Sequence, residues 1–195
     1  MASLARQCWL FAVGSVLFAV ATAPGFPALV GAGAVNAACF AGSWFFTAAA
    51  GMQLAGTDPE DRLEWSSGAV QLVGALLFNL STGSAVWAHA VAEERRYVWT
   101  PDAFGSAAFL VSGVLAVVAV IGATGVVALR SRRWHAAALN LSGCVAFGVS
   151  AVAAFVRQTG VTEDERLANL GTFIGALCFL VAALLTLPRS PRCTD

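Results

Sequence analysis

The stretch Gly42-Ser43-Trp44-Phe45-Phe46 lies inside an apolar run and recurs, with variations, five more times along the chain. In every copy a phenylalanine follows the glycine by four residues, and small residues follow it by one, seven and eight. At 100° per residue these positions share one helix face about 120° wide. The repeat therefore predicts one helix built six times. The motif residues are Gly14, Gly42, Gly74, Gly105, Gly143 and Gly175, with Phe18, Phe46, Phe78, Phe109, Phe147 and Phe179.

A face of glycine, alanine and serine lets membrane helices approach each other closely. Close packing matters there because lipid gives one apolar helix no hydrophobic reason to bind another. We interpret the glycines and phenylalanines as a helix-packing motif, in which each ring fills the groove beside a close contact. A catalytic role would not need the same phenylalanine in every copy.

The composition indicates a membrane protein. Hydrophobic residues make up 58% of the chain and charged residues 11%, less than half of the ~25% usual in soluble domains. The longest charge-free stretch is broken by Pro24-Gly25-Phe26-Pro27, because proline does not continue a helix. We expect residues 1–195 to form a single integral membrane domain, an all-α polytopic bundle of six transmembrane helices in three hairpins. The predicted spans are 8–23, 29–54, 66–90, 102–127, 134–156 and 167–187.

The distribution of arginine predicts the orientation. The eleven basic residues, all arginine, equal the acidic residues in number, so the net charge gives no reason to expect a nucleic-acid partner. With six spans, one side carries seven arginines and the other four. The richer side usually faces the cytoplasm, so we expect a multi-pass protein of the bacterial cytoplasmic membrane with both termini cytoplasmic. Arg130, Arg132 and Arg133 on that side are candidate contacts for anionic lipid or a partner.

Four segments carry a resemblance to a known family: RLEWSSGAVQLVGALLFN (62–79), VWTPDAFGSAAFLVSG (98–113), AALNLSGCVAFG (137–148) and LANLGTFIGALCFLVAALL (167–185). With their repeated G-S-x-x-F hairpins they resemble the YrhK-like multi-pass membrane proteins of actinobacteria. The similarity covers nearly the whole chain. It implies a membrane bundle built from hairpins and transfers no catalytic residues.

The sequence shows no catalytic or metal-binding pattern. No predicted span has a charged residue in its interior, so a coupled proton pathway is not expected. The cysteines lack the paired spacing of zinc or redox motifs. Thr100-Pro101-Asp102 reads as a helix start, with an acid at the positive end of the helix dipole. We therefore expect no enzyme activity, no cofactor and no metal.

Amide side chains are the remaining polar signal within the spans. Gln71 and Asn140 each lie three residues before their motif glycine, on the cytoplasmic side, and Asn36 and Asn169 lie six before theirs, towards the outside. The two pairs are candidates for a polar pocket. Alternatively they are interhelical hydrogen bonds, worth about 0.6 kcal/mol each on average, and the sequence alone favours this reading.

Two functions stay open. The first is a structural or interaction role in the membrane, in which the arginine cluster contacts lipid, a second copy of the chain or another membrane protein. The alternative is a small-solute channel or transporter. Its candidate polar lining is Gln71, Asn79, Asn140, Asn169 and Asn36.

Overall fold

The structure, a computed structural model, describes residues 2–88, 90–124 and 131–188. Within these ranges the chain is α-helical and has no β-strand. Short segments join the long helices: α2 (Phe26–Val30), α5 (Val91–Glu93) and the π-helical η1 (Glu94–Trp99). The long helices are α1 (Ala2–Thr22), α3 (Ala32–Gly56), α4 (Arg62–Ser84), α6 (Thr100–Thr124), α7 (Arg132–Ala153) and α8 (Glu165–Thr186).

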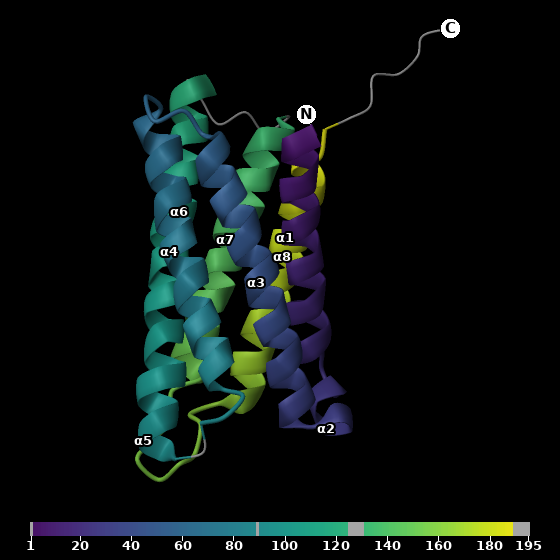
Figure 1. The fold of residues 1–195 in the computed structure, drawn as a ribbon, viewed down its shortest axis with the longest axis vertical. Coiled ribbons are helices and arrows are strands. Elements are labelled where there is room, and N and C mark those ends of the chain that lie inside the picture. Colours follow the sequence, from purple (N-terminus) through teal and green to yellow (C-terminus); the bar gives the residue numbers. More distant parts are fainter. Residues whose placement is uncertain (1, 89, 125–130, 189–195) are drawn as a thin grey trace, which may run out of the picture.

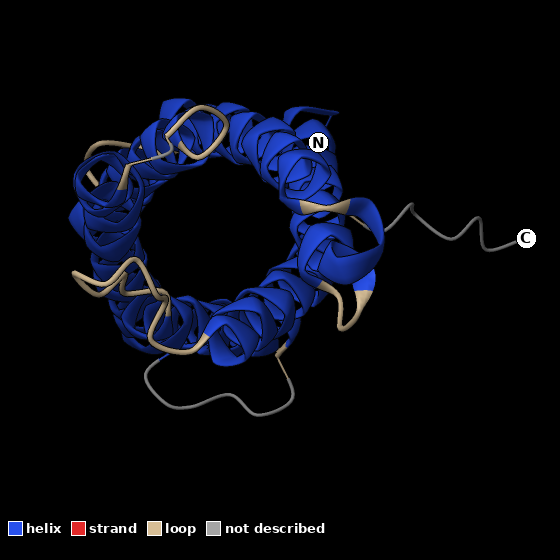
Figure 2. Cartoon of the chain, turned by 90° about the horizontal axis from the view of Figure 1, so that it is seen from below, coloured by secondary structure: helices blue, strands red, loops and turns tan. Residues whose placement is uncertain are grey.

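The six long helices close into a ring (Figures 1 and 2). Each packs beside the next in the chain and runs in the opposite direction, and α8 returns to pack on α1. The contacts are most extensive within three hairpins, α1 with α3, α4 with α6, and α7 with α8. We call the end where α1 begins and α8 finishes the upper end, as drawn in Figure 1. The other is the lower end.

The helix that contains Asp102 begins earlier than the sequence predicts. α5, η1 and α6 are continuous from Val91 to Thr124, so Thr100-Pro101-Asp102 is not a helix start. The backbone N–H of Thr100 bonds to the Arg95 carbonyl five residues back, and the Thr100 hydroxyl donates to the same oxygen at 2.7 Å. A proline ring clashes with the preceding turn of an α-helix, and the wider π turn relieves this clash before Pro101.

The other helix ends agree with the predicted spans to within a few residues, with two exceptions. α1 already begins at Ala2, and α4 ends at Ser84 rather than near residue 90. Residues 125–127 of the predicted span 102–127 lie outside the described residues. The predicted break between the first two spans is present: Gly25 (φ 86°) precedes α2, and Gly31 (φ 79°) follows it.

A reciprocal contact between two glycines holds each hairpin together. A Cβ added to Gly14 would lie 2.9 Å from the Gly42 carbonyl oxygen, and one added to Gly42 would lie 3.2 Å from that of Gly14. The same exchange joins Gly74 with Gly105 and Gly143 with Gly175, at 3.0 to 3.2 Å. Each hairpin therefore has an approximate two-fold axis at its glycines. The helices approach too closely there for any side chain.

The repeat face is turned inward and the opposite face outward. The residues one and seven positions after each glycine are all buried, from Ser15 and Ala21 in α1 to Ala176 and Ala182 in α8. The residues two and six positions after it lie on the opposite side of the helix, where most are large and exposed. They include Val16, Val20, Trp44, Leu76, Leu80, Val111, Val145, Val149, Leu177 and Val181.

Four segments are long and apolar enough to cross a membrane: Ser3–Thr22, Val91–Thr124, Arg132–Ala153 and Glu165–Thr186. α3 and α4 are not among them, although they belong to the same ring. The finding indicates a membrane protein. The prediction of six spans additionally requires α3 and α4 to cross the membrane.

Gly175→Ala tests the hairpin contact. The new Cβ would lie 2.6 Å from Cδ2 of Phe147 and 3.0 Å from the Gly143 carbonyl oxygen. We expect the free energy of unfolding to fall by about 1–3 kcal/mol, the usual cost of overpacking. The measurement is thermal unfolding in detergent, followed by circular dichroism.

Gly51→Ala in α3 is the matched control, because a Cβ there meets nothing within 4 Å. It should leave stability unchanged or raise it by up to about 1 kcal/mol through helix propensity. Equal effects of the two substitutions would contradict the packing role of Gly175.

Candidate functional site

The six motif phenylalanines meet on the axis of the ring in two layers, and all are buried. Phe18, Phe78 and Phe147 form the lower layer, with ring centroids 5.5 to 6.4 Å apart. Phe46, Phe109 and Phe179 form the upper layer, where Phe179 lies 5.7 Å from Phe46 and 6.1 Å from Phe109. The layers stack on each other, at 5.0 Å between Phe78 and Phe109 and 5.3 Å between Phe147 and Phe179. They close the centre of the ring.

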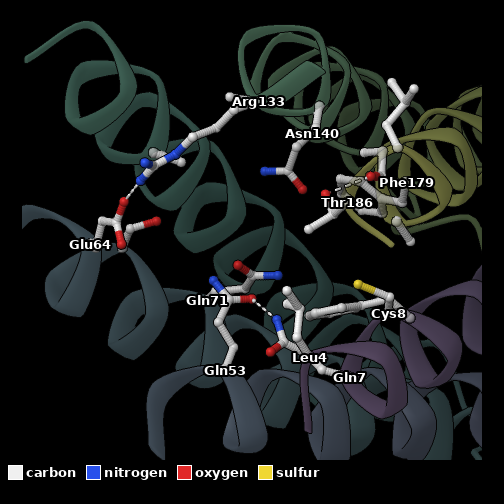
Figure 3. Close-up of a pocket in the computed structure, with 18 of the residues that line it drawn as sticks. Leu4, Gln7, Cys8, Gln53, Glu64, Gln71, Arg133, Asn140, Phe179 and Thr186 are labelled. Atoms are coloured by element: carbon white, nitrogen blue, oxygen red, sulfur yellow. Dashed lines mark hydrogen bonds and ion pairs between the residues drawn. The ribbon is translucent and has the colours of Figure 1, made fainter. Parts of the chain in front are cut away.

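A cavity of about 710 Å³ lies above the phenylalanine layers (Figure 3). All six long helices line it, and Phe46 and Phe179 form part of its floor. Gln7 of α1 and Gln53 of α3, on neighbouring helices of the ring, line it and share a hydrogen bond of 3.4 Å. The amides of Gln71 and Asn140 point into the same space. We call this space the upper cavity.

Charged side chains lie only at the rim of the upper cavity, among the residues that line it. Glu64 of α4 forms an ion pair with Arg133 of α7, and Arg132 lies beside them. Deeper in, Ser67 and Ser112 each donate to the other's backbone carbonyl, at 2.9 and 2.8 Å. Below the rim the described lining is uncharged, and it combines polar groups such as the Gln71 amide with apolar side chains such as Met52 and Val120.

A second cavity, of about 580 Å³, lies below the phenylalanine layers. It is also lined by all six long helices, with η1 at its side, and Phe18, Phe78 and Phe147 form its roof. Asn36 donates from Nδ2 to the Ala85 carbonyl at 2.7 Å and closes the end of α4. Asn169 and Asp102 line the same space. We call it the lower cavity.

One position of the repeat faces the two cavities in every copy. The residue three before the motif glycine lines the upper cavity in α1, α4 and α7, and the lower cavity in α3, α6 and α8. The glycine, the small residues and the phenylalanine of the repeat are nearly constant, whereas this position varies in size, polarity and charge. The six residues are Phe11, Gln71 and Asn140 above, and Cys39, Asp102 and Thr172 below.

The structure brings together four of the five amides predicted as polar lining, in the two pairs that the sequence suggested. Gln71 and Asn140 share the upper cavity, and Asn36 and Asn169 share the lower one. Asn79 lines neither. Its Nδ2 donates to Thr47 Oγ1 at 2.8 Å between α4 and α3, while its buried Oδ1 accepts no hydrogen bond from any described residue.

The arginine cluster divides between described and undescribed parts of the chain. Arg132 and Arg133 lie at the rim of the upper cavity, and Arg130 lies outside the described residues. Because Arg133 is already paired with Glu64, part of its charge is compensated within the bundle.

Sequence reasoning missed Gln7, Gln53 and Asp102. The two glutamines lie near helix ends, where polar side chains carry no signal of their own. Asp102 looked like an acid in the first turn of a helix, because Thr100 and Pro101 before it looked like a cap and a first-turn proline. Its signal was its place in the repeat, three residues before Gly105, which is the position that Gln71 and Asn140 occupy in their own helices.

The described residues offer no cluster of three or more His, Cys, Asp or Glu side chains that could hold a metal ion. Comparison of the chain with family models, with curated proteins and with solved structures finds no match. The site is therefore interpreted from its own geometry.

The separation of the two cavities can be tested by cysteine labelling. In a variant without native cysteines, we expect Gln71→Cys to react with a charged, membrane-impermeant thiol reagent only from the upper side, and Asn169→Cys only from the lower side. The reason is that the phenylalanine layers leave the reagent no route between them. The measurement is mass spectrometry of protein labelled in sealed vesicles of known orientation.

Asn79→Cys is the control that should stay unlabelled, because its side chain lies between α3 and α4. Labelling of Gln71→Cys and Asn169→Cys from the same side would contradict two separate cavities.

Proposed function

We propose that this chain is an integral membrane protein whose ring of six helices encloses a gated pathway for a small polar solute. The observation that carries the proposal is the order of features along the axis. A cavity with polar groups set in a largely apolar lining is followed by two layers of phenylalanine rings and then by a second cavity of the same kind. Hydrophobic constrictions of this kind close pores by excluding water.

Polar side chains inside the bundle are costly for a protein that only needs to be a scaffold. Polar side chains inside a membrane bundle usually mark a pathway. Here they come from every hairpin and face the axis rather than only a neighbouring helix. This arrangement supports a transport role over the structural role that the sequence alone favoured.

The proposal includes six spans, with both termini in the cytoplasm of a bacterium. α3 and α4 have 25 and 23 residues, more than α1, α7 and α8, and lie in the same ring, so a bilayer that the four apolar segments cross would enclose α3 and α4 too. Asn36 and Gln53 of α3 lower its hydropathy, but both line cavities rather than the outer face. We also propose membership of the YrhK-like family, on the sequence segments alone.

The hairpins are the natural moving parts of this gate. Contacts within a hairpin are more extensive than contacts between hairpins, so a hairpin can tilt as a unit. Each hairpin contributes one ring to each layer, for example Phe78 and Phe109 from α4 and α6. A small outward tilt of one hairpin would therefore open both layers together.

Removing one ring from each layer should open the pathway. We expect Phe109→Val with Phe147→Val to raise the glycerol permeability of proteoliposomes above that of the wild type, which is closed at rest. Adding Asn140→Leu should lower it again, because the upper cavity loses a polar side chain. The measurement is stopped-flow light scattering after an osmotic step, on protein shown to be folded by circular dichroism.

Phe104→Val is the control, because this ring is 66% exposed on the outer face of α6. If the double variant is folded and its liposomes stay as tight as those of the control, the proposed pathway is wrong.

The alternative is the structural or interaction role that uses the arginine cluster. It predicts that Arg132→Gln with Arg133→Gln weakens binding to anionic lipid or to a partner, since each arginine contributes about 1 kcal/mol near an anionic surface. A flotation assay with vesicles of defined anionic content measures this. Unchanged flotation would count against the role.

A further inference from the structure

Among the described residues, the charged side chains that line the lower cavity are all acidic. Asp102 lies beside the phenylalanine roof, and Glu94 and Glu165 line the same space. The chain contains no lysine, and none of its arginines is among the described residues that line this cavity. The described lining of the lower cavity therefore carries negative charge without a positive side chain beside it.

The described arginines at the lower end of the bundle have other contacts or are exposed. Arg95 lies over the Phe155 ring at 5.0 Å, and Arg96 over Tyr97 at 5.5 Å. Arg157 forms an ion pair with Glu163 in the connection between α7 and α8. Arg166 is exposed. None of these side chains lines the cavity.

Asp102 has no partner among the described residues. Its carboxylate forms no hydrogen bond or ion pair with any of them, although it lies inside the continuous helix Val91–Thr124. It occupies the variable repeat position, so Cys39 and Thr172 stand at the same level on the alternate helices α3 and α8. A carboxylate in a membrane bundle is costly without a counter-charge. A ligand can supply that charge.

Neutral oxygen acceptors line the same cavity. Asn36 donates its Nδ2 to the Ala85 carbonyl, which leaves Oδ1 as an acceptor. Ser150 donates its hydroxyl hydrogen to the Ala168 carbonyl at 2.7 Å, so in the 2.8 Å pair of Ser150 and Thr172 the donor is Thr172. Thr172 therefore keeps only acceptor capacity. A ligand that brings N–H donors complements both residues.

The size and roof of the cavity indicate the rest of the ligand. A volume of about 580 Å³ suits a small molecule better than a bare ion. The described residues also lack a three-ligand cluster for a metal. The rings of Phe18, Phe78 and Phe147 offer an apolar surface to an alkyl chain, and aromatic rings attract a nearby ammonium group.

We propose that the lower cavity binds a small aliphatic ammonium ion, with the charged nitrogen at the Asp102 carboxylate and the alkyl chain under the phenylalanine roof. The single carboxylate at the roof selects a single positive charge, and Glu94 and Glu165 draw cations towards the cavity. If the ammonium ion is also the solute that the pathway carries, the inference rests on the proposed function. The binding of the ion in the lower cavity does not depend on that function.

The test is calorimetric titration of the purified full-length protein in detergent with n-butylammonium chloride, at constant ionic strength. We expect saturable binding by the wild type. Asp102→Asn should weaken it at least about ten-fold, because a charge-assisted hydrogen bond is lost. Asp102→Glu keeps the charge and should keep binding, which covers the case in which Asp102→Asn does not fold.

Glu60→Gln is the matched control, since it removes one exposed acid in the connection between α3 and α4, away from the lower cavity, and should leave binding unchanged. n-Butanol tests whether the apolar surface alone suffices, and sodium chloride whether any cation does. The proposal is overturned if the wild type shows no saturable binding, if Asp102→Asn is folded and binds as tightly, or if n-butanol or sodium binds equally well.

Transport measurements separate this inference from the proposed function. Binding of n-butylammonium by protein that stays impermeable even with Phe109→Val and Phe147→Val would leave the site intact and remove the pathway. Glycerol flux through that variant without n-butylammonium binding would leave the pathway intact and remove the site.

Discussion

The rest of the structure depends on the approach of two glycines in each hairpin. Gly143 and Gly175 come so close that an added Cβ on either would lie 3.0 Å from the other's carbonyl oxygen. At this distance the phenylalanine one turn further along each helix reaches the glycine of its partner, as Phe147 does at Gly175. The same ring reaches the axis of the bundle. The glycines therefore determine both the hairpin and the aromatic core.

Repetition of this unit explains why the centre is closed while the ends are hollow. All six rings lie within about a turn of the glycines, so they fill the middle of the ring. Further along each helix the inward residues differ in size and polarity, from Phe11 to Gln71 and Asp102, and they leave the two cavities. The constant residues of the repeat form the scaffold and the constriction. The repeats differ chemically at the position three residues before the glycine, which Asp102 occupies in α6.

The helix repeat and its buried face could be predicted from the sequence because they depend only on spacing along one helix. The pairing of Gln71 with Asn140, and of Asn36 with Asn169, followed from the same register. What could not be predicted was how the faces combine. The sequence does not say that the phenylalanines meet on one axis, nor that Asn79 points to Thr47 instead of a cavity. Asp102 was misread because a π turn, which has no clear sequence signal, carries the helix through Pro101.

The reciprocity of the glycine contacts also bears on the origin of the chain. Both helices of a hairpin present the same glycine surface to each other, and the three hairpins are arranged around one axis. A polypeptide one third as long, with a single hairpin, would therefore close the same ring as a homotrimer. After tandem fusion of such an ancestor, the three hairpins no longer need identical sequences. An acid can then occupy one of the three equivalent positions that line the lower cavity, as Asp102 does, while the other two hold Cys39 and Thr172.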